Sequence, residues 1–474
     1  DGKGVQVGFV GAVTAREVGT AGTTIEPRTS YVVGRLVREY RGGRSQLGAQ
    51  VTSLHRELDD VTAPVLRRSA VMGVVQGYHR FGSNRYEVQA YGGVNRVEGS
   101  AEAIGLTQLS SVHYYQRPDI GVHYDPSRTV MGGSTLSATV RKTAGSVRWD
   151  IYTRRATPGL ELNDMGFVPN VNDFQVRSQV SFLSRKPGRW YRQTNVFAQH
   201  DAHWTTSDGL PSGMNGQLHW SASLLNFWGV ALTVDFSNLA NTHCVSCARG
   251  GPAVRQSPRA TYRFNLGGDA RRAVEPSVDL RTGGGDGGRS TWQSAGGAVK
   301  VRLASRTSLE VGGSYENRVE NAQWVGNYGD ALSDTTHFTF GRLAQKTTSV
   351  TFRGNFTATP ALTFQLYAQP FVSSGTYTDW RELADAKAVA YDARYKTYRG
   401  GISPGGFNVK QFNSNVVMRW EYRPASTLFV VWQQGRAQSG VNDGTFAFAR
   451  DYRDLFRTHP DNTLLLKLAY WFNP

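Results

Sequence analysis

Hydrophobic and polar residues alternate with a period of two along much of this chain. Between residues 147 and 152, for example, Val, Trp and Ile alternate with Arg, Asp and Tyr, and segments 174–182, 217–224 and 361–369 repeat the pattern. Successive side chains of a β-strand point to opposite faces of its sheet. The alternation therefore predicts strands that each have one apolar and one polar face.

About 20 such strands are expected along the chain. Most are about ten residues or longer, which exceeds the five or six residues usual in soluble sheets and fits a tilted strand that crosses a membrane. The predicted strands cover residues 4–17, 30–40, 44–57, 69–81, 84–97, 133–142, 145–155, 173–185, 189–204, 214–225, 229–236, 257–266, 273–282, 289–304, 307–320, 336–357, 361–374, 408–422, 425–436 and 463–472.

The links between these strands alternate in length. Short links such as Arg41-Gly42-Gly43 and Arg423-Pro424-Ala425 contain turn-forming residues. The long links span residues 18–29, 58–68, 98–132, 156–172, 205–213, 237–256, 283–288, 321–335, 375–407 and 437–462. Because short turns at one rim and long loops at the other are typical of outer-membrane barrels, we predict an all-β, transmembrane antiparallel β-barrel of about 20 strands (18–22). Residues 1–474 would form this single domain, with both termini periplasmic.

The last predicted strand supports the same interpretation. Leu464, Leu466, Leu468, Tyr470 and Phe472 form an apolar alternation that ends close to the C-terminus. An aromatic residue in this place is typical of proteins that the barrel assembly machinery inserts, so we expect that machinery as a partner. Asn473 and Pro474 follow the aromatic residue, so the match to the pattern is good but not perfect.

The composition excludes other classes of protein. Aromatic residues make up 11% of the 474 residues, which is too many for a disordered chain. A helical membrane protein is excluded because no stretch approaches the roughly 20 consecutive apolar residues that a spanning helix needs, and the mean hydropathy is −0.41. The start of the chain at Asp1 lacks the basic and apolar regions of a signal peptide, which we expect to have been removed or to lie outside this sequence.

The chain is strongly basic, with 53 Lys and Arg against 37 Asp and Glu, a net charge of +16. Many basic residues occupy the polar positions of predicted strands, which would line the lumen and favour anions there. The alternative is that Arg and acidic side chains pair with one another and brace a wide barrel. Some of the charge could also lie near lipopolysaccharide phosphates, whereas nucleic acid is a poor partner because the basic residues do not cluster with stacking aromatics. The predicted lumen-lining basic residues are Arg148, Arg154, Arg177, Arg263, Arg281, Lys300, Arg302, Arg419 and Lys467.

Candidate chemical sites are few. Cys244 and Cys247 are the only cysteines, and we expect a disulfide at the tip of an extracellular loop, with a metal site or free thiols as alternatives. The segment from His200 to His203 and the glycine-rich run 283–288 are interpreted as a solvated rim and a flexible loop. We predict no catalytic residues, no metal and no cofactor, and therefore no enzyme.

Several motifs resemble those of a known family over nearly the whole chain. They are Glu26-Pro27-Arg28-Thr29-Ser30-Tyr31, residues 111–119 (SVHYYQRPD), residues 159–167 (GLELNDMGF), Arg249-Gly250-Gly251-Pro252, residues 366–371 (LYAQPF) and the closing run from Phe456 to Pro474. The chain resembles the C-terminal barrel of a bacterial outer-membrane family of unknown function whose members usually carry an N-terminal domain similar to family-nine carbohydrate-binding modules. The resemblance implies an outer-membrane location without an established activity, and the carbohydrate-binding-like domain is absent from this sequence.

A barrel of this width would leak unless its lumen were partly filled. We expect the long loops 98–132 and 375–407 to constrict it, the first through Gln116, Arg117, Asp119, Asp125 and Arg128. In particular, Asp119 and Asp125 should meet the basic wall at residues such as Arg177 and Arg263. The predicted function is a channel or uptake conduit for small anionic or saccharide-like solutes. The alternative is a surface scaffold with a closed lumen that binds a glycan or a protein partner through its extracellular loops, in contact with outer-membrane lipid and lipopolysaccharide.

Overall fold

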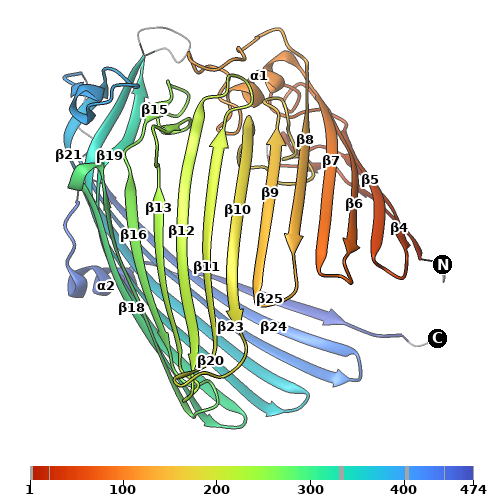
Figure 1. Ribbon diagram of the computed structural model, residues 1–474, viewed down its shortest axis with the longest axis vertical. Coiled ribbons are helices and arrows are strands. Elements are labelled where there is room, and N and C mark those ends of the chain that lie inside the picture. Colours follow the sequence, from red (N-terminus) through yellow and green to blue (C-terminus); the bar gives the residue numbers. More distant parts are fainter. Residues whose placement is uncertain (1–3, 21, 330–335, 401–404, 442, 473–474) are drawn as a thin grey trace.

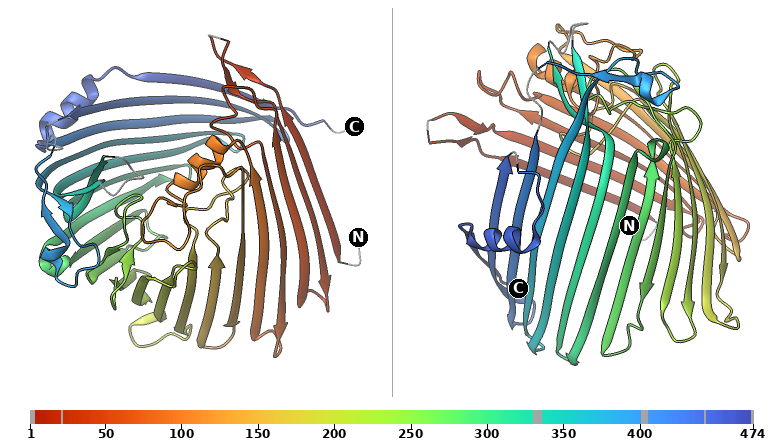
Figure 2. Two further views of the ribbon diagram at one scale, coloured as in Figure 1. Left: turned by 90° about the horizontal axis from the view of Figure 1, so that it is seen from above. Right: turned by 90° about the vertical axis from the view of Figure 1, so that its left-hand side faces the viewer.

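The computed structural model shows one long antiparallel β-sheet that curls into a barrel (Figure 1). It describes residues 4–20, 22–329, 336–400, 405–441 and 443–472. Seen from above, the strands are arranged around helix α1 (Ala101–Leu109) and the loops beside it (Figure 2). The fold is thus the predicted all-β, transmembrane-type antiparallel barrel.

The main sheet has 21 strands, and without the three-residue β22 (Tyr395–Thr397) it has 20 long ones, as predicted. The long strands are β1 (Val5–Thr14), β4 (Thr29–Tyr40), β5 (Ser45–Arg56), β6 (Ser69–Phe81), β7 (Tyr86–Glu98), β8 (Val130–Lys142), β9 (Val147–Ala156), β10 (Asp173–Ser184), β11 (Tyr191–Trp204), β12 (Pro211–Leu224), β13 (Gly229–Ser237), β16 (Arg259–Gly267), β17 (Val274–Gly285), β18 (Ser290–Ala304), β19 (Thr307–Tyr328), β20 (His337–Thr359), β21 (Leu362–Leu383), β23 (Gly406–Arg423), β24 (Ser426–Val441) and β25 (Asp461–Ala469).

Each long strand pairs with the next long strand in the sequence, so the chain winds once around the barrel. Strand β1 pairs with β4, and β25 pairs with β24. Within the described residues no backbone pairing joins β1 to β25, so the seam of the barrel lies between them. Both edge strands are exposed along nearly their whole length. Strand β1 begins at Val5 and β25 ends at Ala469, and both of these strand ends lie at the rim that carries the short turns. We call it the short-turn rim.

The two faces of the sheet differ in the way that the alternation predicts. The outer face exposes large apolar side chains, including Leu218 at 53% and Leu464 at 66%. The inner face carries most of the charged strand residues, and α1 packs against it. The side chains predicted to face lipid all lie on the outer face by register: Trp149, Val176, Trp220, Phe264, Leu366 and Leu468.

The long loops contain structure that the alternation did not predict. Helix α1 lies in the link between β7 and β8, and helix α2 (Phe448–Arg457) lies between β24 and β25. The remaining elements are β2 (Glu17–Val18), β3 (Thr24–Glu26), β14 (His243–Cys244), β15 (Val254–Arg255), η1 (Asp286–Gly288) and η2 (Tyr391–Arg394). In the part of the chain that the structure describes, no helix is long and apolar enough to cross a membrane.

Two predicted long links are wrong in their extent. Strand β19 continues to Tyr328, through more than half of 321–335, and β20 begins only at His337. Strand β21 continues to Leu383, so the link expected at 375–407 is really 384–405. The extensions are hidden in the sequence because most of their residues are polar, and their few apolar side chains, such as Trp324 and Leu383, pack against residues of other loops around Phe340. Residues 330–335 and 401–404 of these links, and Asn473 and Pro474, lie outside the described residues.

Candidate functional site

The inner wall of the barrel is basic. Strand registers place all nine predicted lumen-lining residues on one continuous face. Helix α1 covers part of this same face, at the end of the barrel that carries the long loops. Arg177, for example, lies opposite Tyr152, and Arg419 lies opposite Phe429, which in turn lies opposite Lys467. The nine residues are Arg148, Arg154, Arg177, Arg263, Arg281, Lys300, Arg302, Arg419 and Lys467.

Only some of these cations have acidic partners. Arg177 lies 3.9 Å from Asp150, Arg302 3.2 Å from Glu275, and Arg419 2.9 Å from Glu421. A further ladder joins Arg80, Glu87 and Arg141 on the same face. The bracing interpretation therefore holds for part of the wall. The other six, Arg148, Arg154, Arg263, Arg281, Lys300 and Lys467, form no ion pair within the described residues.

Arg263 and Arg281 are the most unusual of the unpaired cations. They are directly opposite each other on neighbouring strands β16 and β17, and both side chains are partly buried. The Nε atom of each has no hydrogen-bond partner within the described chain. Like charges directly opposite each other on a sheet repel and destabilise it. An anion between the two guanidinium groups would satisfy both, so this pair is a candidate anion site of the inner wall.

A segment of the β7–β8 link, residues 99–129, fills part of the barrel at the end that carries the long loops, which we call the mouth. We name it the plug segment. Its Ile104 and Tyr115 are buried against the inner-face residues Leu54, Ala70, Val97 and Met131, which are consecutive partners across β5 to β8. Burial of these apolar groups holds the segment inward, because projection into water would expose them.

The plug segment begins with a capped helix. The Ser100 side chain accepts a hydrogen bond from the Ala103 N–H at 3.1 Å and donates one to the Ala63 carbonyl at 2.9 Å. It therefore caps α1 and ties it to the neighbouring loop. The sequence held a signal for this helix, since Ser100 precedes a run of helix-forming residues.

A cluster of three charged residues, Arg56, Arg67 and Asp164, connects the plug segment to the neighbouring loops. The Asp164 carboxylate, 4% exposed, accepts hydrogen bonds from Arg56 Nη1 at 2.7 Å and Arg67 Nε at 2.6 Å. Arg67 also donates to Thr107 of α1 at 2.9 Å. The end of β5 and the β5–β6 link that follows it are thereby joined to the β9–β10 link, about 100 residues later, and to the plug segment.

A buried His–Glu pair adds a second connection. His113 Nε2 lies 3.0 Å from Glu161 Oε2, and its Nδ1 lies 2.8 Å from the Pro158 carbonyl. Burial by itself raises the pKa of Glu161. The hydrogen bonds from His113 and the Asn163 N–H, together with the charge of Arg67, outweigh burial, so that the pKa lies below its ordinary value.

The β9–β10 link also approaches the barrel wall very closely. The Asn95 amide donates to the Glu161 carbonyl at 2.7 Å and its oxygen accepts from the Gly133 N–H at 3.0 Å. A Cβ on Gly133 would lie only 2.2 Å from the Leu160 nitrogen, so glycine is required there. This link and the plug segment together cover part of the mouth.

Between the two covering segments and the wall lies a cavity of about 650 Å³, which we call the mouth cavity. Its lining is polar and aromatic and includes Tyr114, Arg117, His203 and Arg249. His203 lies between Asp173 and Asp201, at 2.9 and 3.0 Å. Arg117 is 4% exposed, and its Nε has no hydrogen-bond partner in the described part of the protein. Arg117 therefore places a buried cation in the lining of the cavity, with Asp119 as its ion-pair partner.

The predicted constriction residues lie in the plug segment, but the contacts expected for its two acids are wrong. Asp119 accepts from Arg117 at 2.9 Å and from the Ala253 N–H at 2.9 Å. Asp125 accepts from the Ser127 N–H at 3.0 Å and lies 3.8 Å from Arg128. Neither meets Arg177 or Arg263, because partners within the loops of the mouth, one of them the Ala253 N–H of the cysteine loop, already satisfy the two carboxylates. The remaining predicted residue, Gln116, donates to the Leu109 carbonyl at 3.3 Å.

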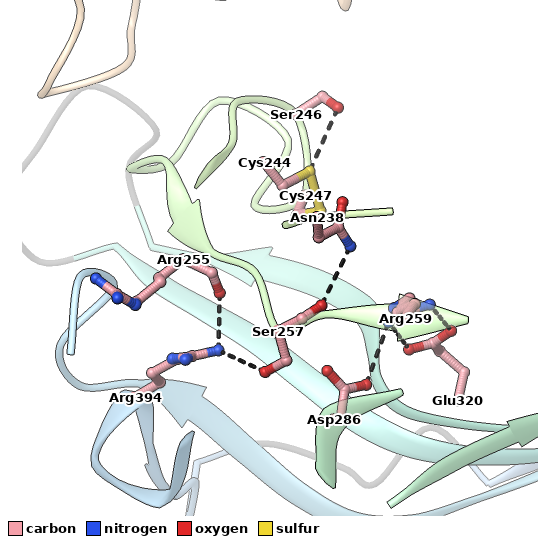
Figure 3. The surroundings of a disulfide bond; sticks show 10 residues. All are labelled: Asn238, Cys244, Ser246, Cys247, Arg255, Ser257, Arg259, Asp286, Glu320 and Arg394. Carbon is pink, nitrogen blue, oxygen red and sulfur yellow. Dashed lines mark hydrogen bonds and ion pairs between the residues drawn. A yellow bond between two sulfur atoms is a disulfide. The ribbon is translucent and has the colours of Figure 1, made fainter. Parts of the chain in front are cut away.

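The loop that carries the two cysteines also lines the mouth cavity, through Val245, Ser246 and Arg249. A disulfide joins Cys244 to Cys247 (Figure 3). Below it, Arg394 donates to the Arg255 carbonyl at 2.9 Å and so ties the β21–β22 link to this loop. Arg259 pairs with Glu320 at 2.7 Å and with Asp286 at 3.2 Å. No group of three or more His, Cys, Asp or Glu suited to a metal ion occurs within the described ranges.

Comparisons with known proteins identify a family whose description names no activity. The family model described as "Domain of unknown function (DUF5916)" matches residues 102–473. A search of curated proteins found no match.

Solved structures resemble the chain only distantly. The siderophore receptor PirA from Acinetobacter baumannii has a TM-score of 0.43 at 7% identity, over 98% of this chain and 73% of that one. A mutant of the ferric enterobactin receptor from Pseudomonas aeruginosa has a TM-score of 0.40 at 7% identity, over 91% and 75%. An anion-selective porin from Comamonas acidovorans has a TM-score of 0.30 at 12% identity, over 68% and 91%. Similarity this low supports no transfer of ligand or mechanism.

Proposed function

The chain belongs to the family described as a domain of unknown function (DUF5916), and we propose that it is an outer-membrane channel or uptake conduit for small anionic solutes, including acidic saccharides. The long, outward-apolar strands and the sorted turns support a membrane location. The proposal places the short-turn rim in the periplasm and the mouth outside the cell. It assigns the protein no catalytic role and no cofactor.

The observation that carries the proposal is the cross-strand pair Arg263 and Arg281. Two partly buried guanidinium groups face the lumen without an acidic partner in the described chain. Structural bracing does not explain them, since bracing requires an acid such as Asp150 beside Arg177. A positively charged lumen with low-dielectric walls raises the local concentration of anions.

The mouth cavity favours a second candidate function. Its volume of about 650 Å³ is within the usual range for small-molecule sites, and Tyr114 can stack on a sugar ring while the exposed Arg249 binds an acidic group. A barrel that binds a glycan at the mouth without conducting would use the same residues. In that case the plug segment keeps the lumen closed.

Reversal potentials in a planar bilayer under a KCl gradient test the channel. We expect anion selectivity in the parent, and a clear shift toward non-selectivity in the double variant Arg263→Gln/Arg281→Gln. The matched control, Arg185→Gln/Lys186→Gln, removes the same charge from an exposed short turn and should leave selectivity unchanged. An equal shift in both variants would refute the role of the inner wall, and a parent that never opens would favour the glycan-binding alternative.

A further inference from the structure

Helix α2 lies outside the barrel. It occupies the link between β24 and β25, and Figure 2 shows it in front of the strands when its side of the barrel faces the viewer. On the sheet, Thr348 of β20 lies opposite Val372 of β21, which in turn lies opposite Lys410 of β23. Their register places all three on the outer face. The Tyr452 hydroxyl lies 3.0 Å from Thr348 Oγ1. The helix thus covers a part of the wall that would otherwise face the membrane.

Polar groups on the outer wall explain why the helix is held there. Lys410 lies 3.8 Å from Asp451 and is 6% exposed, while Asp451 is fully buried. Asn408 also donates to Asp451 at 3.2 Å. A lysine on the lipid face destabilises a barrel most near the bilayer midplane and less toward the interface. Helix α2 removes that destabilisation by supplying the acid and by covering the pair.

The helix lies at the upper edge of the apolar band. On β24 the outer positions change from Leu428, Val430 and Trp432 to Gln434 and Arg436 on moving toward the mouth. Arg436 then donates to the Thr458 carbonyl at 2.9 Å, just beyond the last turn of α2. A helix fixed at the level where the wall becomes polar lies at the depth of lipid headgroups.

The exposed surface of α2 is divided into an aromatic and a basic flank. Phe448, Tyr452 and Phe456 recur every fourth residue along one side, and Phe448 and Phe456 are 55% and 49% exposed. The basic flank consists of Arg450, Arg453 and Arg457.

The two flanks face different levels of the wall. The Phe456 ring lies 5.3 Å from that of Phe412, which is nearer the apolar band than Lys410. Arg450 instead reaches Asp443 at 3.4 Å, on the side of the mouth. The aromatic flank therefore faces the acyl chains, and the basic flank faces the water side.

The basic flank is only partly neutralised by the chain itself. Arg450 pairs with Asp451 and Asp443. The side chain of Arg453 is 61% exposed and comes no nearer than 4.0 Å to the Asp454 carboxylate, so this pair is weak. Arg457 is exposed and has no ion pair in the ranges that the structure describes. Arg453 and Arg457 are one helical turn apart, so both can reach the same anion.

We propose that α2 is an interfacial helix whose Arg453 and Arg457 bind the phosphate groups of lipid headgroups in the surrounding outer leaflet. Guanidinium groups bind phosphate through paired hydrogen bonds, and basic amphipathic helices with aromatic residues lie in this way at anionic membrane surfaces. The site is independent of conduction, since it requires only that the barrel spans a membrane. A channel that fails to conduct would leave this proposal standing.

Site-specific labelling tests the depth of the helix. Because both native cysteines form a disulfide, Phe456→Cys can carry a bimane label, and Val389→Cys, 76% exposed in a mouth loop, serves as the aqueous reference. The folded barrel is placed in phosphatidylcholine vesicles that contain lipid A. We expect iodide to quench the label at 456 several-fold less than the label at 389. Equal quenching would overturn the interfacial position, and protection that depends on protein concentration would point to a protein partner instead.

Native mass spectrometry tests the anion site. The parent should retain lipid A, and Arg453→Gln/Arg457→Gln should lower the retained fraction about five-fold or more. The control Arg185→Gln/Lys186→Gln should behave as the parent does, and heat-shifted gel migration will confirm that each barrel is folded. Unchanged retention in the α2 variant, or an equal loss in the control, would overturn the assignment of Arg453 and Arg457.

Discussion

Removal of the Asp164 carboxylate should release the plug segment from the inner wall. Asp164 is 4% exposed and accepts a hydrogen bond from each of two arginines, Arg56 at 2.7 Å and Arg67 at 2.6 Å. In Asp164→Ala both guanidinium groups lose this partner. Arg67 also loses the orientation from which it donates to Thr107 of α1. The plug segment should therefore open more often while the barrel wall stays intact.

The expected magnitude follows from the one bond of the cluster that reaches the plug segment, from Arg67 to Thr107. A hydrogen bond to a charged group contributes about 1.5 to 3 kcal/mol. The arginine side chains are 15% and 20% exposed, so water replaces part of the lost interaction and the lower end of that range applies. One bond at the lower end gives about 1.5 kcal/mol. Since each 1.4 kcal/mol is a factor of ten, the open population should rise about tenfold.

Hydrogen exchange measured by mass spectrometry reads this population directly. Amides of residues 101–115 should exchange about tenfold faster in Asp164→Ala, whereas amides of the long strands should keep their rates. Asp60→Ala is the matched control, because Asp60 is exposed in the neighbouring link and has no ion pair within the described residues. If both variants exchange like the parent at residues 101–115, the ion cluster does not hold the plug segment and the reasoning fails.

Four further predictions concern the mouth, the lipid face and the disulfide. Deletion of about 20 residues from 101–120 should raise single-channel conductance several-fold, and unchanged conductance would show that the plug segment does not constrict the pore. Val176→Arg should lower the free energy of unfolding in lipid by about 2 to 4 kcal/mol, because the side chain faces the membrane, and an unaltered denaturant midpoint would contradict that facing. Replacing Cys244 and Cys247 by Ser should leave assembly intact, as judged by heat-shifted gel migration, because a two-residue spacer closes only a small ring. Because the pKa of Glu161 is lowered in the folded protein, its contacts stabilise the mouth fully at pH values above the ordinary carboxyl pKa of 4.5. This stabilisation is lost as the pH falls through the lower pKa of the folded state, so hydrogen exchange at 101–115 should accelerate there in the parent. The Glu161→Gln variant should show a smaller pH dependence.

The sequence alone determines the barrel wall. All 20 long strands, their order and the face of residues such as Arg177 and Val176 follow from the period-two alternation, since a strand buried against lipid on one side must repeat every second residue. The sorting of short and long links fixes which strand ends share a rim. These features are local, because each depends only on neighbouring residues in the chain.

Only the tertiary structure decides what the loops do. Arg67 and Asp164 meet across 97 residues, and Asp119 bonds to a backbone amide 134 residues away, so no local pattern marks either contact. The expectation that Asp119 would meet the wall is wrong for this reason: a nearer partner appears only when separate loops fold over the mouth together. Helix α2 is a similar case. Its charged and aromatic residues give a helical period, but only its packing on Lys410 shows that it lies outside the barrel, where the surrounding medium is lipid.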